Sequence, residues 1–404
     1  MSHHSTADVP TILFGAFDRH NVGDLLFPHI VQHLLDRKNL IFAGLAERDL
    51  RDCGGHQVKS LARLAEAYRE QAVNIIHVGG ELLTCNAWEA AVMLQTPAHA
   101  QEVILAFEGH TRRKLEWAHQ QLGLPALAPY SVSRSLFPRA RIFYHAVGGV
   151  SLDQCDPLIQ AEVRANLRAA DSISVRDGRT QAILDAAGIA SQLVPDPAVA
   201  VAELFGERIG QHAKHGEVAR VRDAFPKGYL AVQFSADFGD DRTLNRTAQQ
   251  LDQLAHTFGY GIVFFRAGAA PWHDDLSCYQ RTAARMQTSA VHMFESLGLW
   301  DICALIACSS AYAGSSLHGR ILAMAFGLPR VNLRSPSQGN DASKQEAFAA
   351  AWEVSGMPRS VAVDELVAAM HEACAIEREQ LRQAAKQLAE RHRREFARLS
   401  DRID

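Results

Sequence analysis

The stretch "VNIIHVGG" (residues 73–80) is a short apolar run that ends in a double glycine. Its residues favour a β-strand that is buried on both faces, and the glycines mark the place where the strand ends. The same form returns in "RIFYHAVGG" (141–149), an apolar strand with a histidine before two glycines. Strands of this kind are typical of a parallel sheet that helices cover on both sides.

Strands and helices alternate outward from these two segments. Apolar runs predict further strands, at residues 11–17, 172–177, 191–199, 228–235, 260–268 and 328–333. Helical patterns lie between them, as in "LNRTAQQLDQLAHTFG" (244–259). We therefore predict an α/β fold of two Rossmann-like, doubly wound domains that face each other across a cleft, followed by a C-terminal helix.

Composition sets the expected domain boundaries. We expect a disordered N-terminus at residues 1–10, an N-terminal domain at 11–205 and a C-terminal domain at 228–362. The polar, charged stretch 206–227 is expected to be a linker, and the charged tail 363–404 is expected to be helical. In folds of this class, ligands bind at the carboxyl ends of the strands, often between domains.

Composition also points to a water-soluble globular protein, with 48% hydrophobic and 21% charged residues. The net charge of −4 gives no reason to expect nucleic acid as a partner. The seven cysteines form no C-x-x-C pair and the 19 histidines show no metal-ligand spacing, so we expect a reducing compartment and no metal. No run is apolar enough to span a bilayer and no signal peptide is seen. We expect a cytoplasmic protein, free or peripheral at the inner face of the membrane; homo-oligomer formation is left open.

The most informative motif is "GSSLHGRILAMAFGLP" (314–329). Ser315 or Ser316 can cap a helix whose first-turn N–H groups then form an anion site. His318 and Arg320 stand in this first turn, ahead of an apolar and therefore buried helix. His318 could simply bind a backbone group and Arg320 could pair with an acid. Because cap, cation and histidine coincide, we favour a functional site.

Loops after the other strands supply candidates for a donor or acceptor cleft. In "HNVGDLLFP" (20–28), Gly23 allows a tight turn, Asp24 suits a helix N-cap and Asn21 could bind the loop or a ligand. The glycines that follow residues 73–78, Gly79 and Gly80, allow close approach of a ligand, although close packing is the simpler explanation.

Two further loops carry charged candidates. Arg176 in "SVRDGRTQAIL" stands at a strand end, where it could form a salt bridge or a fork for carboxylate or phosphate, and Asp177 suits an N-cap. Arg266 and His273 lie in "FFRAGAAPWHDD", where His273 and Asp274 form an acid–base candidate.

The order of these motifs resembles the polysaccharide pyruvyl transferase family. It runs Asn-x-Gly-Asp, Gly-Gly, Ser-Val-Arg-Asp, Asp-Pro-Ala (196–198) and Ser-Ser-Leu-His-Gly-Arg, over roughly residues 11–333. The resemblance implies two Rossmann domains of glycosyltransferase-B type with the site between them. It also implies transfer of pyruvyl from phosphoenolpyruvate to a saccharide, commonly as a ketal on two hydroxyls, in exopolysaccharide or cell-wall polysaccharide synthesis. The acceptor could be lipid-linked, and phosphoenolpyruvate is a substrate, so no cofactor is expected.

The same resemblance assigns roles to residues. His318, in its Leu-His-Gly context, matches the catalytic histidine of the family, and Arg176 matches a donor-binding arginine. Many members carry arginine directly before the Leu-His pair, where this chain has Ser316. Arg320, one turn further on, is the candidate replacement, beside Ser315 and Ser316 at the donor site.

Two alternatives stay open. A glycosyltransferase that uses a nucleotide-sugar could have the same two-domain architecture, but it would need a ribose-binding acid, and none is clear in the second half of the sequence. A catalytically degenerate homologue that binds glycan is supported by Ser316 alone.

Overall fold

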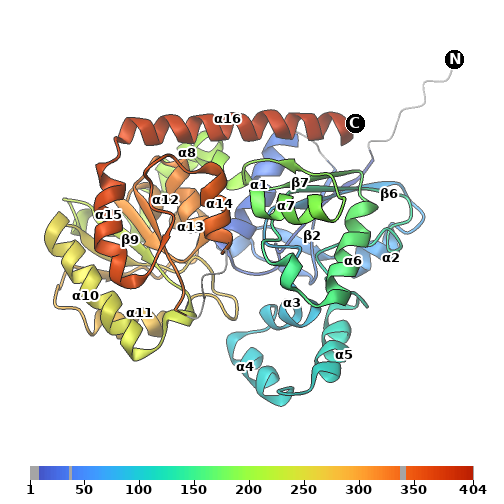
Figure 1. Ribbon diagram of the computed structural model, residues 1–404, viewed down its shortest axis with the longest axis horizontal. Helices are drawn as coiled ribbons and strands as arrows, with labels where there is room; N and C mark the ends of the chain where they lie inside the picture. Colours follow the sequence, from blue (N-terminus) through green and yellow to red (C-terminus); the bar gives the residue numbers. More distant parts are fainter. Residues whose placement is uncertain (1–8, 36–38, 337–342, 404) are drawn as a thin grey trace.

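The computed structural model describes residues 9–35, 39–336 and 343–403. The expected disordered N-terminus (1–10) lies outside these ranges, apart from Val9 and Pro10. The described chain forms two α/β halves, each built on one sheet, with a long helix across both (Figure 1). The predicted fold class is therefore confirmed.

The N-terminal sheet has eight strands in the order β3-β4-β2-β1-β5-β6-β7-β8, and only the β3–β4 pair is antiparallel among those described. Its strands are β1 (Thr11–Phe14), β2 (Leu40–Gly44), β3 (Arg48–Asp49), β4 (Gln57–Ser60), β5 (Val73–Val78), β6 (Ala140–Val147), β7 (Ser172–Val175) and β8 (Gln192–Leu193). Its helices are α1 (Val22–Leu35), α2 (Leu61–Ala67), α3 (Ala87–Met93), α4 (Pro97–Ala106), α5 (Thr111–Leu122), α6 (Pro157–Arg168) and α7 (Gly178–Ala186).

The C-terminal sheet has six parallel strands in the order β11-β10-β9-β12-β13-β14. They are β9 (Tyr229–Gln233), β10 (Gly261–Phe264), β11 (Val291–Met293), β12 (Ala311–Gly314), β13 (Arg330–Leu333) and β14 (Ser360–Val361). Its helices are α8 (Val201–His212), α9 (Gly216–Ala224), α10 (Asp241–Phe258), α11 (Leu276–Ala283), α12 (Leu299–Ala307), α13 (Leu317–Ala325), α14 (Lys344–Trp352), α15 (Leu366–Ala375) and α16 (Arg378–Ile403).

The predicted strands are present, but most are shorter than their apolar runs. The largest difference is at 191–199, where only Gln192–Leu193 is a strand. Pro197 cannot donate to a strand ladder, and Asp196 instead accepts a hydrogen bond from the N–H of Ala198 at 3.0 Å and starts the 3₁₀ helix η3 (Pro197–Ala200). The chain therefore turns at Asp196, a point that matters for the site.

The segment expected as a linker, 206–227, is largely helical. It contains the second half of α8 and all of α9, and α8 packs against α12, where His212 Nδ1 lies 2.6 Å from Asp301 Oδ1. The sequence reading also missed a lobe formed by α3, α4 and α5, which extends away from the N-terminal sheet (Figure 1). Trp88, Phe107 and Trp117 pack together inside this lobe.

Helix α16 lies across both halves of the molecule (Figure 1). It leaves the C-terminal half after α15 and reaches the N-terminal sheet, where Arg141 donates to the backbone carbonyl of Ile403 at 3.4 Å. Phe396 of this helix belongs to an apolar cluster that also contains Val31 of α1 and Ile302 of α12. The two halves therefore share a continuous core. In the described ranges, no helix combines the length and apolar character that membrane crossing requires.

A buried histidine pair marks the contact between α16 and the N-terminal sheet. Nε2 of His145 on β6 lies 3.1 Å from Nε2 of His392 on α16, and both side chains are buried. Burial lowers the pKa of His392 to about 4, although the nearby Asp196 carboxylate acts to raise it. Burial also lowers the pKa of His145 well below its usual value. Both imidazoles are therefore neutral when α16 is docked.

This pair predicts a pH-dependent loss of stability. The unfolded histidines have pKa values near 6.5, so their contribution is complete above about pH 6.5 and falls as the pH drops toward the folded values. Each buried histidine contributes a slope of up to about 1.4 kcal/mol per pH unit in the free energy of unfolding. His392→Leu should reduce this slope between pH 6 and pH 4.5 by about 1.4 kcal/mol per pH unit, which corresponds to one proton. Urea denaturation at a series of pH values measures it. His110→Leu, at an exposed position, is the control, and an unchanged slope in His392→Leu would contradict the assignment.

Candidate active site

A cavity of about 350 Å³ lies between the two halves. Loops at the carboxyl ends of the strands line it, as is expected for open α/β sheets. The N-terminal half contributes four of the predicted residues: Asn21, Asp24, Gly80 and Arg176. The C-terminal half contributes five more: His273, Asp274, Ser315, Ser316 and His318. The structure thus brings together residues that the sequence separates by almost three hundred positions.

The N-terminus of α13 forms one wall. Ser316 caps this helix, and its Oγ accepts a hydrogen bond from the N–H of Gly319 at 3.1 Å. The N–H of Ser316 donates to Gln233 Oε1 at 2.8 Å, and Ser315 Oγ accepts from the N–H of Ser235 at 3.0 Å. All nine residues of α13 are buried, so the helix is a fixed support for its polar first turn. The predicted cap and the predicted burial are confirmed.

His318 is packed tightly against the N-terminal half. Its ring meets Phe27 edge-on, with ring centroids 5.2 Å apart, and only 9% of the residue is exposed. The His318 ring lies so close to Gly23, in the first turn of α1, that only glycine fits there: a Cβ would overlap the ring. Nε2 of His318 lies 3.8 Å from Oδ2 of Asp196, which is within ion-pair range but too long for a hydrogen bond.

Asp196 is the buried anion of the site. It is fully buried, which by itself raises its pKa, but His318, Arg176 and the N–H of Ala198 outweigh burial and lower the pKa to about 2. The carboxylate therefore stays charged at neutral pH, beside the imidazole. The sequence analysis found Asp196 in the Asp-Pro-Ala motif and predicted no role for it.

Arg176 forms ion pairs within this cluster. Its Nη1 donates to Asp196 at 3.1 Å and its Nη2 donates to Glu81 at 2.8 Å, with only 2% of its side chain exposed. Two carboxylates thus already balance the guanidinium. The salt bridge that the sequence left open for Arg176 is present, while the residue also lines the cavity.

Two cations that sequence reasoning missed also line the cavity. Arg19, in the loop after β1, donates to the Tyr130 hydroxyl at 3.3 Å, and its Nε lies 4.0 Å from Asp24. Lys344, the first residue of α14, is solvent-exposed at the cavity wall. Arg19 follows the end of a predicted strand, and this position could have indicated a cavity residue. Lys344 lies outside all the motifs of the sequence analysis.

Several candidates have structural roles instead. Asp24 is not the N-cap of α1: the helix begins at Val22, and Asn21 Oδ1 accepts the N–H of Gly23 at 3.1 Å. Gly79 has a φ of +58° and packs against Phe27, so close packing explains it. Gly23, Gly79 and Arg266 lie outside the cavity lining.

His273 and Asp274 do not form an acid–base pair. His273 Nδ1 faces the carbonyl of Pro271 at 3.0 Å. Asp274 accepts hydrogen bonds from Gln233 at 2.6 Å and from the N–H groups of Ala267 and Gly268 at 2.6 and 3.2 Å. Asp274 therefore shapes the loop that carries both residues.

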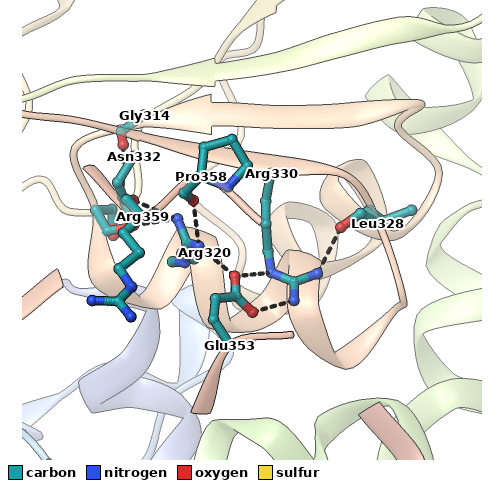
Figure 2. Close-up of polar contacts among 9 residues, drawn as sticks. Gly314, Arg320, Leu328, Arg330, Asn332, Glu353, Pro358 and Arg359 are labelled. Atoms are coloured by element: carbon teal, nitrogen blue, oxygen red, sulfur yellow. Dashed lines mark hydrogen bonds and ion pairs between the residues drawn. The ribbon is translucent and has the colours of Figure 1, made fainter. Parts of the chain in front are cut away.

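The prediction that Arg320 binds the donor is corrected by the structure. Its side chain is fully buried on the far side of α13, where it pairs with Glu353 and donates to the carbonyls of Pro358 and Arg359, each at 2.7 Å (Figure 2). Arg330 pairs with the same Glu353 carboxylate. Helical geometry explains the error: residues two apart on a helix point to different sides, so His318 and Arg320 cannot share one face.

These features define a class of protein: two Rossmann-like domains of glycosyltransferase-B type with a histidine-containing cavity between them. The family model of the polysaccharide pyruvyl transferases matches residues 21–336, and the chain belongs to that family. A search of curated protein sequences returns no significant match.

Solved structures confirm the fold. A putative UDP-N-acetylglucosamine 2-epimerase from Listeria monocytogenes has a TM-score of 0.56 at 9% identity, over 96% of this chain and 92% of its own. The UDP-GlcNAc 2-epimerase of Methanocaldococcus jannaschii has a TM-score of 0.55 at 10% identity, over 94% of this chain and 99% of its own. At these identities the likeness concerns the fold alone.

The buried Arg320–Glu353–Arg330 cluster leads to a stability prediction. Glu353→Gln removes the one carboxylate that both buried guanidiniums share, and an unpaired buried charge typically costs about 3–5 kcal/mol. Chemical denaturation should show a loss of this size in the free energy of unfolding. Glu346→Gln is the matched control, because its pair with Arg359 is solvent-exposed and worth under about 1 kcal/mol. Equal losses in the two variants would contradict the prediction.

Proposed function

We propose that this protein transfers the pyruvyl group of phosphoenolpyruvate to hydroxyls of a saccharide and forms a pyruvate ketal, in exopolysaccharide or cell-wall polysaccharide synthesis. The observation that carries the proposal is the His318–Asp196 pair at the wall of an interdomain cavity that also holds cations. Family membership supports the reaction class.

The cavity suits a small dianionic donor. Phosphoenolpyruvate carries a carboxylate and a phosphate, and each needs a cation or a set of N–H donors. Arg19 and Lys344 are the candidate cations, because Arg176 is already balanced by Glu81 and Asp196. The first turn of α13 adds the positive end of a helix dipole at the same wall. Arg176 would then hold the His318–Asp196 pair in place and face the donor at its edge.

The reaction needs two proton transfers that a histidine can serve. A saccharide hydroxyl loses its proton and adds to C2 of phosphoenolpyruvate, while a proton is added to the C3 methylene, which becomes a methyl group. Phosphate then leaves C2 with the bonding electron pair, and a second hydroxyl of the same sugar attacks C2 and loses its proton. The products are the ketal and inorganic phosphate. We assign these proton transfers to His318, which lines the cavity and lies 3.8 Å from the Asp196 carboxylate.

A nucleotide-sugar glycosyltransferase is the alternative function. The structural neighbours include an epimerase in complex with UDP-GlcNAc and UDP, with a TM-score of 0.53. The experiment below includes UDP-sugars to discriminate between the two donors. A degenerate, glycan-binding homologue would bind saccharide without turnover.

The direct test is release of phosphate from phosphoenolpyruvate in the presence of a saccharide panel. His318→Ala should lower kcat by about 10²–10⁴-fold, the usual contribution of a positioned proton-transfer group. Thermal-shift titration should show stabilisation by phosphoenolpyruvate in preference to UDP-sugars. Equal rates for His318→Ala and the wild type would remove His318 from the mechanism, and UDP-sugar turnover would replace the proposed donor.

Gly23→Ala gives an independent test of the His318 geometry. In a helix this change is normally stabilising by about 1 kcal/mol, but here the new Cβ would overlap the His318 ring and displace it. We expect a folded protein whose kcat falls toward that of His318→Ala. Gly178→Ala, at the first residue of α7 with open space around the position, is the matched control and should keep full activity. Full activity in Gly23→Ala would show that the ring contact does not position His318.

A further inference from the structure

Trp272 is an exposed aromatic residue at the wall of the cavity. It is 49% exposed, and it lines the cavity together with Ser235 and Asp237. The other exposed large hydrophobic residues in the described chain, which are Val9, Leu105 and Leu158, are not part of that lining. Trp272 is therefore the one exposed large hydrophobic residue of the described chain that a ligand in the cavity could contact.

The backbone of Trp272 is strained. Its φ is +62°, a left-handed conformation that is unfavourable for a residue with a bulky side chain. Glycine could occupy this position at no such cost. Strain of this kind persists where the surroundings impose it, and it gathers at binding and active sites.

The loop that carries Trp272 is fixed by hydrogen bonds on both sides. Asp274 ties the end of the loop back to its beginning through the N–H groups of Ala267 and Gly268. The N–H of Ala269 donates to the carbonyl of His20 at 3.1 Å, and the N–H of Val22 donates to Ala267 at 2.8 Å, so the loop is joined to the N-terminal half. The indole is therefore presented in a defined position.

The same network sets the position of this loop relative to His318. Asp274 accepts from Gln233 Nε2 at 2.6 Å, and Gln233 Oε1 accepts from the N–H of Ser316, the cap of the helix that carries His318. One glutamine thus connects the base of the Trp272 loop with the base of the catalytic helix. Gln233 therefore fixes the position of the Trp272 loop relative to the N-terminus of α13.

We propose that the Trp272 indole is the platform on which the sugar ring of the saccharide acceptor stacks. The inference rests on the proposed function and adds the position of its acceptor. The apolar C–H face of a pyranose packs on an aromatic face, while its hydroxyls bind polar groups such as Ser235 and Asp237 at the same wall.

The charge of the ring selects the occupant. The face of an aromatic ring carries partial negative charge, so it repels the carboxylate and phosphate of phosphoenolpyruvate and accepts the partially positive C–H groups of a neutral sugar. Donor and acceptor thus have separate positions within one cavity. The anionic groups of phosphoenolpyruvate bind at Arg19 and Lys344, and the sugar binds at Trp272.

The test uses the full chain and four variants: Trp272→Phe, Trp272→Ala, Trp272→Gly and, as control, Leu158→Ala at an exposed site on α6. The probes are methyl hexosides and methyl N-acetylhexosaminides, with uridine as a competing ring. Saturation-transfer NMR should show ring C–H protons of a saccharide in contact with the wild type. Trp272→Ala and Trp272→Gly should weaken binding about tenfold or more, Trp272→Phe less, and Leu158→Ala not at all.

Two further readouts separate a platform from a structural role. Phosphoenolpyruvate binding by thermal shift should be unchanged in all four variants, and Trp272→Gly should melt about 1 °C above Trp272→Ala, because glycine relieves the strained φ. Unchanged saccharide binding in Trp272→Ala, preference for uridine over every saccharide, or no saccharide binding by the wild type would overturn the proposal. Failure of phosphoenolpyruvate turnover with intact, Trp272-dependent saccharide binding would instead refute the proposed reaction and leave the platform standing.

Discussion

The carboxylate of Asp196 is the interaction on which the rest of the site depends. It is fully buried, and Arg176, His318 and the N–H of Ala198 stabilise it there. Arg176 comes from the end of β7 in the N-terminal sheet, and His318 comes from α13 in the C-terminal half. One buried charge therefore couples the position of His318 to the contact between the two halves.

Other contacts hold the same interface around this charge. Trp352 of α14 donates its indole N–H to the carbonyl of Arg176 at 2.7 Å, and Asn21 pairs with Gly268 across the cavity. Helix α16 closes the opposite side, where His392 meets His145. Three separate elements thus cross between the halves and hold the walls of the cavity together. The same contacts leave little room for a wide hinge opening.

The sequence was sufficient for the features that depend on local pattern. The apolar runs located the central strands, and the cap at Ser316 and the buried body of α13 follow from residue types within one turn. The features that it missed depend on partners far along the chain. Arg320 forms an ion pair with Glu353, which lies 33 residues further along the chain, and no sequence spacing rule predicts that pairing.

Lys344 and Asp196 were missed as site residues for the same reason: tertiary packing brings Lys344 to the cavity and Asp196 to His318. The Asp24 cap was wrong because helix α1 starts three residues earlier than expected, so Asn21 takes the capping role. Motifs near strand ends were thus the reliable guide to the cavity, and single charged residues were not.

The cap at Ser316 also explains why the cations of the cavity lie elsewhere. The Ser316 hydroxyl satisfies the N–H of Gly319, a contact worth about 1 kcal/mol to the helix that an arginine at this position could not make. The Ser316 backbone is held as well, since its carbonyl accepts from the Tyr312 hydroxyl at 3.1 Å. A rigid capped turn and a flexible cation cannot both occupy one position. This chain has the rigid turn, and Arg19 and Lys344, which come from the first loop and from α14, supply positive charge from the facing walls.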